Sequence, residues 1–142
     1  MNRIVFLACA LFLMSAGVTH AQQHDQDAIA QNFFAPDLVI QHQEAIGLSD
    51  DQKAYLKSEI RQAQGKFTEW QWKLQDEMEK LASLTKQPNV NEQDVLAQLE
   101  NVLSTEREMK RAQITLLIHI KNKLTPEQQA KLAEIRGQTA NK

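Results

Sequence analysis

The chain has 142 residues, 16 of them basic and 18 acidic, and a formal net charge of −2. Both signs are interspersed, so the sequence lacks the basic stripe that binds nucleic acid and the basic helix face that lies on a membrane surface. Its single cysteine, Cys9, excludes a disulfide within the chain. The G-x-S-x-G, H-E-x-x-H and P-loop motifs of common enzymes are absent, and we expect no catalytic activity.

The first 21 residues have the pattern of a secretory signal peptide. Arg3 supplies a positive start, residues 4–18 are apolar, and Ala21 provides a small residue at the expected cleavage site. This apolar run is shorter than the roughly 20 residues of a transmembrane helix, and no later segment approaches that length. We therefore expect export to the periplasm, cleavage near Ala21 and no stable membrane insertion. Cys9 is then lost with the signal peptide, and residues 22–33 are expected to form a disordered arm.

Few glycines and prolines interrupt the rest of the chain, and they divide it into four expected helices. Pro36 suits a first helical turn, and Gly47 suits a helix stop. Gly137 is expected to end the last helix. The expected helices cover about residues 36–46, 50–84, 92–123 and 126–136. The helical domain therefore spans residues 34–137, and residues 138–142 are expected to form a flexible tail.

The second and third helices each carry one apolar stripe at helical spacing. On the second helix the stripe residues are Leu56, Ile60, Ala63, Phe67, Trp70, Leu74, Met78 and Leu81. On the third helix, which Asn91 caps, they are Val95, Leu99, Val102, Met109, Leu116 and Ile120. Glu106 and Gln113 interrupt this stripe, and Glu106 is expected to be an interface residue that fixes the register of the two helices.

The lengths of these helices decide the fold class. A second helix of about 35 residues measures about 52 Å, whereas a compact domain of about 120 residues has a radius of gyration of about 14 Å. We therefore expect an all-α, elongated hairpin of two long antiparallel helices with short hooked helices at each end. A hairpin buries only one seam, so a homodimer is expected to cover the remaining apolar surface.

One short pattern occurs at the start of both the second and the fourth helix. It consists of a leucine, a hydroxyl residue, two further residues and a glutamine. Its residues are Leu48, Ser49 and Gln52 in the first copy and Leu124, Thr125 and Gln128 in the second. In physical terms the pattern is a capping box, in which the hydroxyl oxygen caps the helix and the glutamine reaches back to the cap. Two unrelated but well-capped helices can also carry it.

In combination with the signal peptide, the thiol-free mature chain and the two long helices, this double L-[ST]-x-x-Q box resembles the Spy/CpxP family of periplasmic proteins. That group includes heavy-metal-resistance and metal-sensor proteins of the CnrX and ZraP type. The resemblance covers about residues 34–136 and implies a four-helix hooked fold that dimerises antiparallel into a curved cradle. For chaperone members it implies ATP-independent binding of unfolded client proteins. For sensor members it implies metal-responsive signalling through a membrane partner such as an anti-sigma factor.

The resemblance to metal-sensor proteins suggests a binding site for Zn, Cu, Ni or Co. Helical metal sites pair ligands three or four residues apart, but the residues at these distances after His42 are alanine and isoleucine. The paired histidines that the resemblance implies on the first helix are therefore absent. The remaining candidate ligands are His42, Glu44, Glu59 and His119. The alternative is that these side chains are surface or helix-end hydrogen-bonding groups and that no cofactor is bound.

The middle of the second helix carries the candidate surface for clients or for a second copy of the chain. Trp72 lies about 200° around the helix from Trp70, so a large aromatic side chain is expected off the core stripe. The candidate residues are Phe67, Trp70, Trp72, Leu74 and Met78. Three functions stay open: a chaperone-like protein for unfolded clients, a metal-responsive sensor and a structural adaptor.

Overall fold

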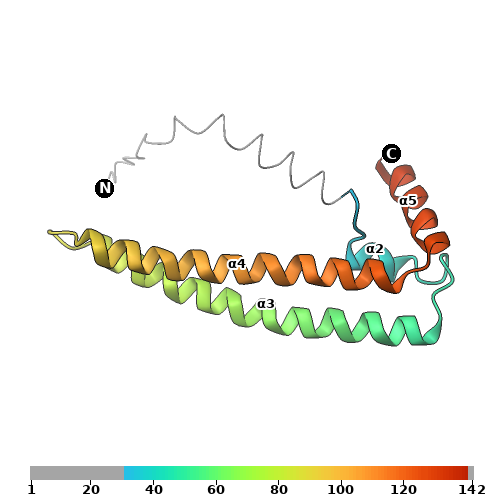
Figure 1. Cartoon of the computed structure of the whole chain (residues 1–142), viewed down its shortest axis with the longest axis horizontal. Helices are drawn as coiled ribbons and strands as arrows, with labels where there is room; N and C mark the ends of the chain where they lie inside the picture. Colours follow the sequence, from blue (N-terminus) through green and yellow to red (C-terminus); the bar gives the residue numbers. More distant parts are fainter. Residues whose placement is uncertain (1–30, 141–142) are drawn as a thin grey trace, which may run out of the picture. The chain divides into compact units, whose positions relative to one another are not determined.

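The computed structural model describes residues 31–140, with side chains described as far as residue 138. The expected signal peptide and most of the expected arm lie outside these residues. Within residues 31–140 the chain forms four helices and no strand, which confirms the all-α class (Figure 1). The helices are α2 (Pro36–Gln41), α3 (Asp50–Thr85), α4 (Glu92–Lys123) and α5 (Pro126–Ala140).

α2 is shorter than expected, because a run of turns replaces the helix after six residues. The turns end in a characteristic pair of hydrogen bonds, in which Leu48 N donates to Gln43 O at 2.9 Å and Gly47 N donates to Glu44 O at 3.1 Å. These are the two bonds of a Schellman motif, which ends a helical segment on a left-handed residue. Gly47 has a φ of 66°. Its role as a stop is confirmed, whereas residues 42–46 are turn and not α-helix.

Both long helices begin at their expected caps. Gln52 N donates to Ser49 Oγ at 3.2 Å, and Ser49 N donates to Gln52 Oε1 at 3.0 Å, which completes a capping box. Asn91 Oδ1 accepts from the backbone N–H groups of Gln93 and Asp94. α3 has 36 residues and α4 has 32, which correspond to about 54 Å and about 48 Å of helix.

α5 extends beyond its expected end, since it continues through Gly137 to Ala140. A glycine ends a helix where it takes the left-handed conformation. Within the described residues, Gly47 is the only glycine with a positive φ. Gly137 keeps a helical backbone, so the expected stop there is wrong, and α5 includes the first three residues of the expected tail.

Both short helices pack at the same end of the hairpin (Figure 1), which corrects the expectation of one hook at each end. The reason is that α3 and α4 are antiparallel, so the start of α3 and the end of α4 lie together and bring α2 and α5 with them. The main hydrophobic core lies here, and we call it the hook core. Its buried residues are Phe34, Val39, Ile46, Leu48, Leu56, Ile120, Leu124 and Leu132.

The rest of the hairpin has a thin seam, in which α4 buries only Val102 and Thr105 outside the hook core. Glu106 is exposed, so it does not lie in the seam between α3 and α4, and its expected place at an interface with a second copy stays a prediction. Thr105 takes the buried place one residue earlier, and its hydroxyl donates to Asn101 O at 3.1 Å. A threonine that bonds its own helix is buried without an unpaired polar group, whereas a buried carboxylate would lose its hydration.

Candidate functional site

The side-chain amides of Gln52 and Gln128 meet beside the hook core. Gln52 Nε2 donates to Gln128 Oε1 at 2.9 Å, and Gln128 Nε2 donates to Gln52 Oε1 at 3.0 Å. Each oxygen also closes its own capping box, because it accepts from the backbone N–H of Ser49 at 3.0 Å or of Thr125 at 2.9 Å. The two boxes therefore cap their helices and bond to each other. We call this pair of amides the glutamine clamp.

The second N–H of each amide reaches the chain just ahead of the other box. Gln52 Nε2 donates to Lys123 O at 2.8 Å, and Gln128 Nε2 donates to Gly47 O at 3.1 Å. Lys123 O ends α4, where it lacks a partner within the helix, and Gly47 O lies at the end of the turns that connect α2 to α3. Each amide thus uses both N–H groups and both oxygen lone pairs. Gln128 is buried, and no buried side-chain polar atom in the described residues lacks a partner.

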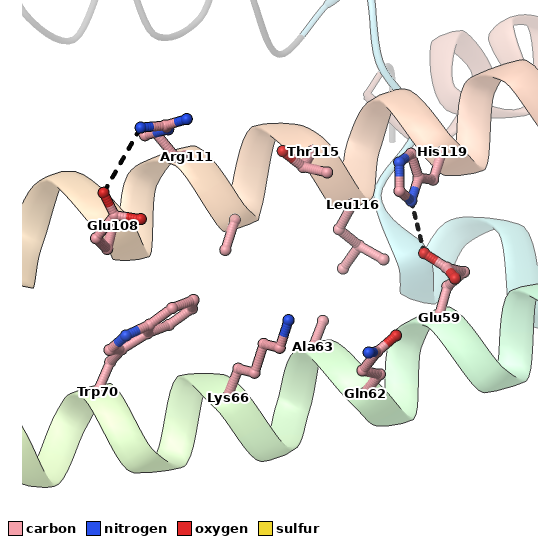
Figure 2. A pocket seen from close by; sticks show the side chains of 11 residues that line it. Glu59, Gln62, Ala63, Lys66, Trp70, Glu108, Arg111, Thr115, Leu116 and His119 are labelled. Carbon is pink, nitrogen blue, oxygen red and sulfur yellow. Dashed lines mark hydrogen bonds and ion pairs between the residues drawn. The ribbon is translucent and has the colours of Figure 1, made fainter.

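The middle of the hairpin is open. Beyond Leu56, α3 has no buried residue, and between Thr105 and Ile120 α4 has none. A cleft of about 340 Å³ lies between the two helices in this stretch (Figure 2). The lining residues are Glu59, Gln62, Ala63, Lys66, Trp70, Glu108, Arg111, Ala112, Thr115, Leu116 and His119.

The two ends of the cleft differ in chemistry. At the end nearer the hook core, His119 Nδ1 and Glu59 Oε2 lie 2.6 Å apart and join α4 to α3. Toward the other end, the Trp70 ring extends from α3 into the space between the helices (Figure 2). Small side chains, Ala63 and Ala112, lie between these ends. A polar pair and an aromatic ring thus flank a stretch of the seam in which both helices contribute a small side chain.

The candidate surface residues divide between seam and solvent. Phe67, Trp70 and Leu74 are half-buried, and the rings of Phe67 and Trp70 are in edge-to-face contact with centroids 6.1 Å apart. Met78 is 49% exposed and Trp72 is 65% exposed. Trp72 therefore lies away from the seam, as its spacing from Trp70 predicts.

Exposed apolar side chains gather in the half of the hairpin that is farther from the hook core, residues 71–105, which we call the distal half. The large hydrophobic residues exposed there are Trp72, Met78, Val90, Leu96 and Leu103. Outside the distal half, Ile118 is the one further large hydrophobic residue that is exposed among the described residues. The hook core is therefore covered, whereas the distal half presents its apolar side chains to solvent.

A polar contact holds the two helices together within the distal half. Gln98 Nε2 donates to Glu77 O at 2.9 Å and to Glu77 Oε2 at 2.6 Å. The hydrogen bond from Gln98 lowers the pKa of the Glu77 carboxyl, and the nearby Lys80 ammonium lowers it further. The carboxylate form of Glu77 is therefore the one that fits this contact.

The four candidate metal ligands do not converge. His119 pairs with Glu59, but Glu44 pairs with Lys53 Nζ at 2.7 Å, and this hydrogen bond raises the pKa of Lys53. His42 is half-buried at the C-cap of α2. In the described part of the chain no three His, Cys, Asp or Glu side chains are placed to share one ion. The structure thus brings two of the four together and gives Glu44 a different partner.

Sequence reasoning singled out neither Lys66 nor Arg111 as a site residue, although both line the cleft. One signal was available, because Ala63 is the only small residue on the apolar stripe of the second helix. A small residue on a core stripe leaves space unless the facing helix fills it. On α4 the lining residues include a second alanine, Ala112, and which residues of α4 line the cleft depends on a register that the sequence does not specify.

Among residues 31–140 no helix combines the length and the apolar character needed to cross a bilayer. Comparisons of the chain with protein-family models, with curated proteins and with solved structures give no match.

Proposed function

We propose that the protein is a periplasmic, ATP-independent chaperone-like protein of the Spy/CpxP type that binds unfolded or misfolded envelope proteins. The observation that supports this proposal best is the exposure of Trp72, Met78, Val90, Leu96 and Leu103 in the distal half. Groups of large apolar side chains on a surface mark interaction sites in soluble proteins. Unfolded proteins expose apolar side chains, which such a surface binds without nucleotide.

The exposed residues of the distal half face more than one direction. Leu96 and Leu103 are seven residues apart and lie on one side of α4. Trp72 lies on the side of α3 that faces away from the seam. We propose that a second copy of the chain covers one of these sides in a homodimer and that a client binds the other. Sedimentation velocity of the mature chain is expected to give the mass of a dimer.

The proposal is tested by diluting a chemically denatured client into buffer with the mature protein and following light scattering. Suppression of aggregation at an equimolar ratio of dimer to client is expected. The Leu96→Gln, Leu103→Gln double variant should lose most of this suppression, because it removes apolar area from the distal half. Ile118→Gln is the matched control, since it changes an exposed apolar residue outside the distal half. No suppression by the unaltered protein would refute the proposal.

A second candidate function, a metal-responsive sensor that signals to a membrane partner, has one contact in its favour. The 2.6 Å pair of His119 and Glu59 brings two ligand-type groups together from α4 and α3. Titration calorimetry with Zn, Cu, Ni and Co tests it. Binding at micromolar concentration that disappears in His119→Ala would support a sensor, and no heat of binding would exclude it.

A further inference from the structure

One cation that lines the cleft between α3 and α4, Lys66, pairs with no carboxylate among the described residues. The charged residues that line the cleft include two pairs, with His119 Nδ1 at 2.6 Å from Glu59 Oε2 and Arg111 Nη1 at 3.7 Å from Glu108 Oε1. Lys66 belongs to none of the ion pairs in the described residues. Each lining carboxylate therefore contacts another basic side chain, and Lys66 is the cleft cation that contacts neither of them.

Apolar surface adjoins this cation. The Lys66 side chain extends from α3 into the space between the helices (Figure 2). Trp70 is four residues further along α3, so the two side chains lie next to each other on one side of the helix. Across the cleft, α4 contributes Ala112 and Leu116. A ligand placed here meets one positive charge and a wall of aromatic and aliphatic groups.

We propose that this cleft binds a small amphipathic organic anion, such as a medium-chain fatty acid. Its carboxylate pairs with Lys66, and its apolar body lies along Trp70, Ala112 and Leu116. An inorganic anion would leave the apolar wall unused, and a neutral hydrocarbon would leave Lys66 unpaired. The cleft volume of about 340 Å³ lies within the usual range of small-molecule sites. The site is separate from the exposed surface of the distal half, so it does not rest on the chaperone proposal.

The test uses the mature protein carrying Trp72→Phe, so that Trp70 alone reports by fluorescence. Dodecanoate is titrated below its critical micelle concentration, and calorimetry gives the stoichiometry. Saturable binding of one dodecanoate per chain with a change in Trp70 emission is expected. Dodecyltrimethylammonium, which has the same tail and a positive head group, should bind at least fivefold more weakly. Equal binding of the two amphiphiles, or no binding of dodecanoate, overturns the proposal.

Two variants separate this site from general binding to apolar surface. Lys66→Met keeps the aliphatic length, removes the charge, and should weaken dodecanoate about fivefold, near the upper limit for an exposed ion pair. Lys73→Met is the control on the same helix outside the cleft lining, and it should bind like the parent. Ala112→Leu fills the cleft and should abolish binding without lowering the melting temperature. If Leu96→Gln, Leu103→Gln removes binding while Lys66→Met does not, the ligand sits on the distal half and the proposal is wrong.

Discussion

The amide groups of Gln52 and Gln128 face each other and exchange two hydrogen bonds, of 2.9 Å and 3.0 Å, between residues 76 positions apart in the chain. Each amide also bonds its own helix cap and a carbonyl just ahead of the other cap. The repeated box therefore has two structural roles. Each copy caps its own helix, and the contact between the two copies fixes the starts of α3 and α5 to each other and to the end of α4.

The Gln128→Glu variant separates helix capping from the contact between the two glutamines. The carboxylate still accepts from Thr125 N, so the capping box is kept. The hydrogen bonds to Gln52 Oε1 and to Gly47 O are lost, and the new carboxylate oxygen faces these two acceptor oxygens. We expect the free energy of unfolding to fall by about 1–3 kcal/mol, the range for leaving buried polar groups unpaired, as measured by urea denaturation. Gln71→Glu, at an exposed position of α3, should stay within about 0.5 kcal/mol of the parent. Equal effects of the two changes would show that the clamp adds nothing beyond capping.

Replacing both amides of the clamp by leucine measures their coupling. Each single variant, Gln52→Leu or Gln128→Leu, leaves the other amide without its partner, whereas the double variant removes both. We therefore expect the double variant to be less destabilised than the sum of the single ones, by about 0.5–3 kcal/mol for groups in one hydrogen-bond network. Additive effects in urea denaturation would contradict a direct interaction.

How far the sequence predicts this structure depends on how local each signal is. The caps at Ser49, Asn91 and Thr125 depend on residues within one helical turn, and all three are confirmed. The contact between Gln52 and Gln128 depends on the register of α3 against α4, which a periodic stripe does not fix. The sequence therefore predicts the two boxes, whereas their contact requires the structure.

The same limit applies to the seam and the cleft. The stripe that includes Ile60, Phe67 and Leu74 was correctly placed on one face of α3, but these residues are only half-buried, because a hairpin offers a single neighbouring helix. On α4 the predicted stripe includes the buried Val102 and Ile120, but it passes through the exposed Glu106 and misses the buried Thr105. One residue is a rotation of 100° on a helix, so a small error in register exchanges a buried position for an exposed one.

The three glycines of the helical region should respond to alanine in opposite directions. An added Cβ meets nothing within 4 Å at Gly47, Gly65 or Gly137. The backbone conformation of each glycine therefore decides whether alanine raises or lowers the free energy of unfolding. Gly47 has a φ of 66°, where a non-glycine residue costs about 1–2 kcal/mol. Gly65 and Gly137 lie within helices, where alanine is favoured by about 0.8–1.0 kcal/mol. Urea denaturation should find Gly47→Ala destabilised and the other two variants stabilised, and stabilisation by Gly47→Ala would contradict the Schellman turn.

The contact of Glu77 with Gln98 should make the distal half sensitive to acid. The pKa of Glu77 is lowered from its ordinary value of 4.5, chiefly by the hydrogen bond from Gln98 and then by Lys80. A carboxyl whose pKa is lower in the folded state stabilises the fold above its ordinary pKa, and this stability is lost as the pH falls through the lowered value. The difference in unfolding free energy between the parent and Gln98→Leu should therefore shrink as the pH is lowered below 4.5. A difference that does not change with pH would contradict the role of the carboxylate.

The two tryptophans should report on different parts of the hairpin. Trp72 is 65% exposed, whereas Trp70 is half-buried beside the cleft. In the Trp70→Phe variant, the emission of Trp72 should be quenched strongly by acrylamide, and in Trp72→Phe the emission of Trp70 should be quenched less. If clients bind the distal half, a denatured client should shift the emission of Trp72 to shorter wavelength and reduce its quenching, because burial removes water from the ring. A client that binds with unchanged Trp72 emission and quenching would place the binding surface on the side of α4 that carries Leu96 and Leu103, and the glutamine variants of those residues would then decide between the two sides.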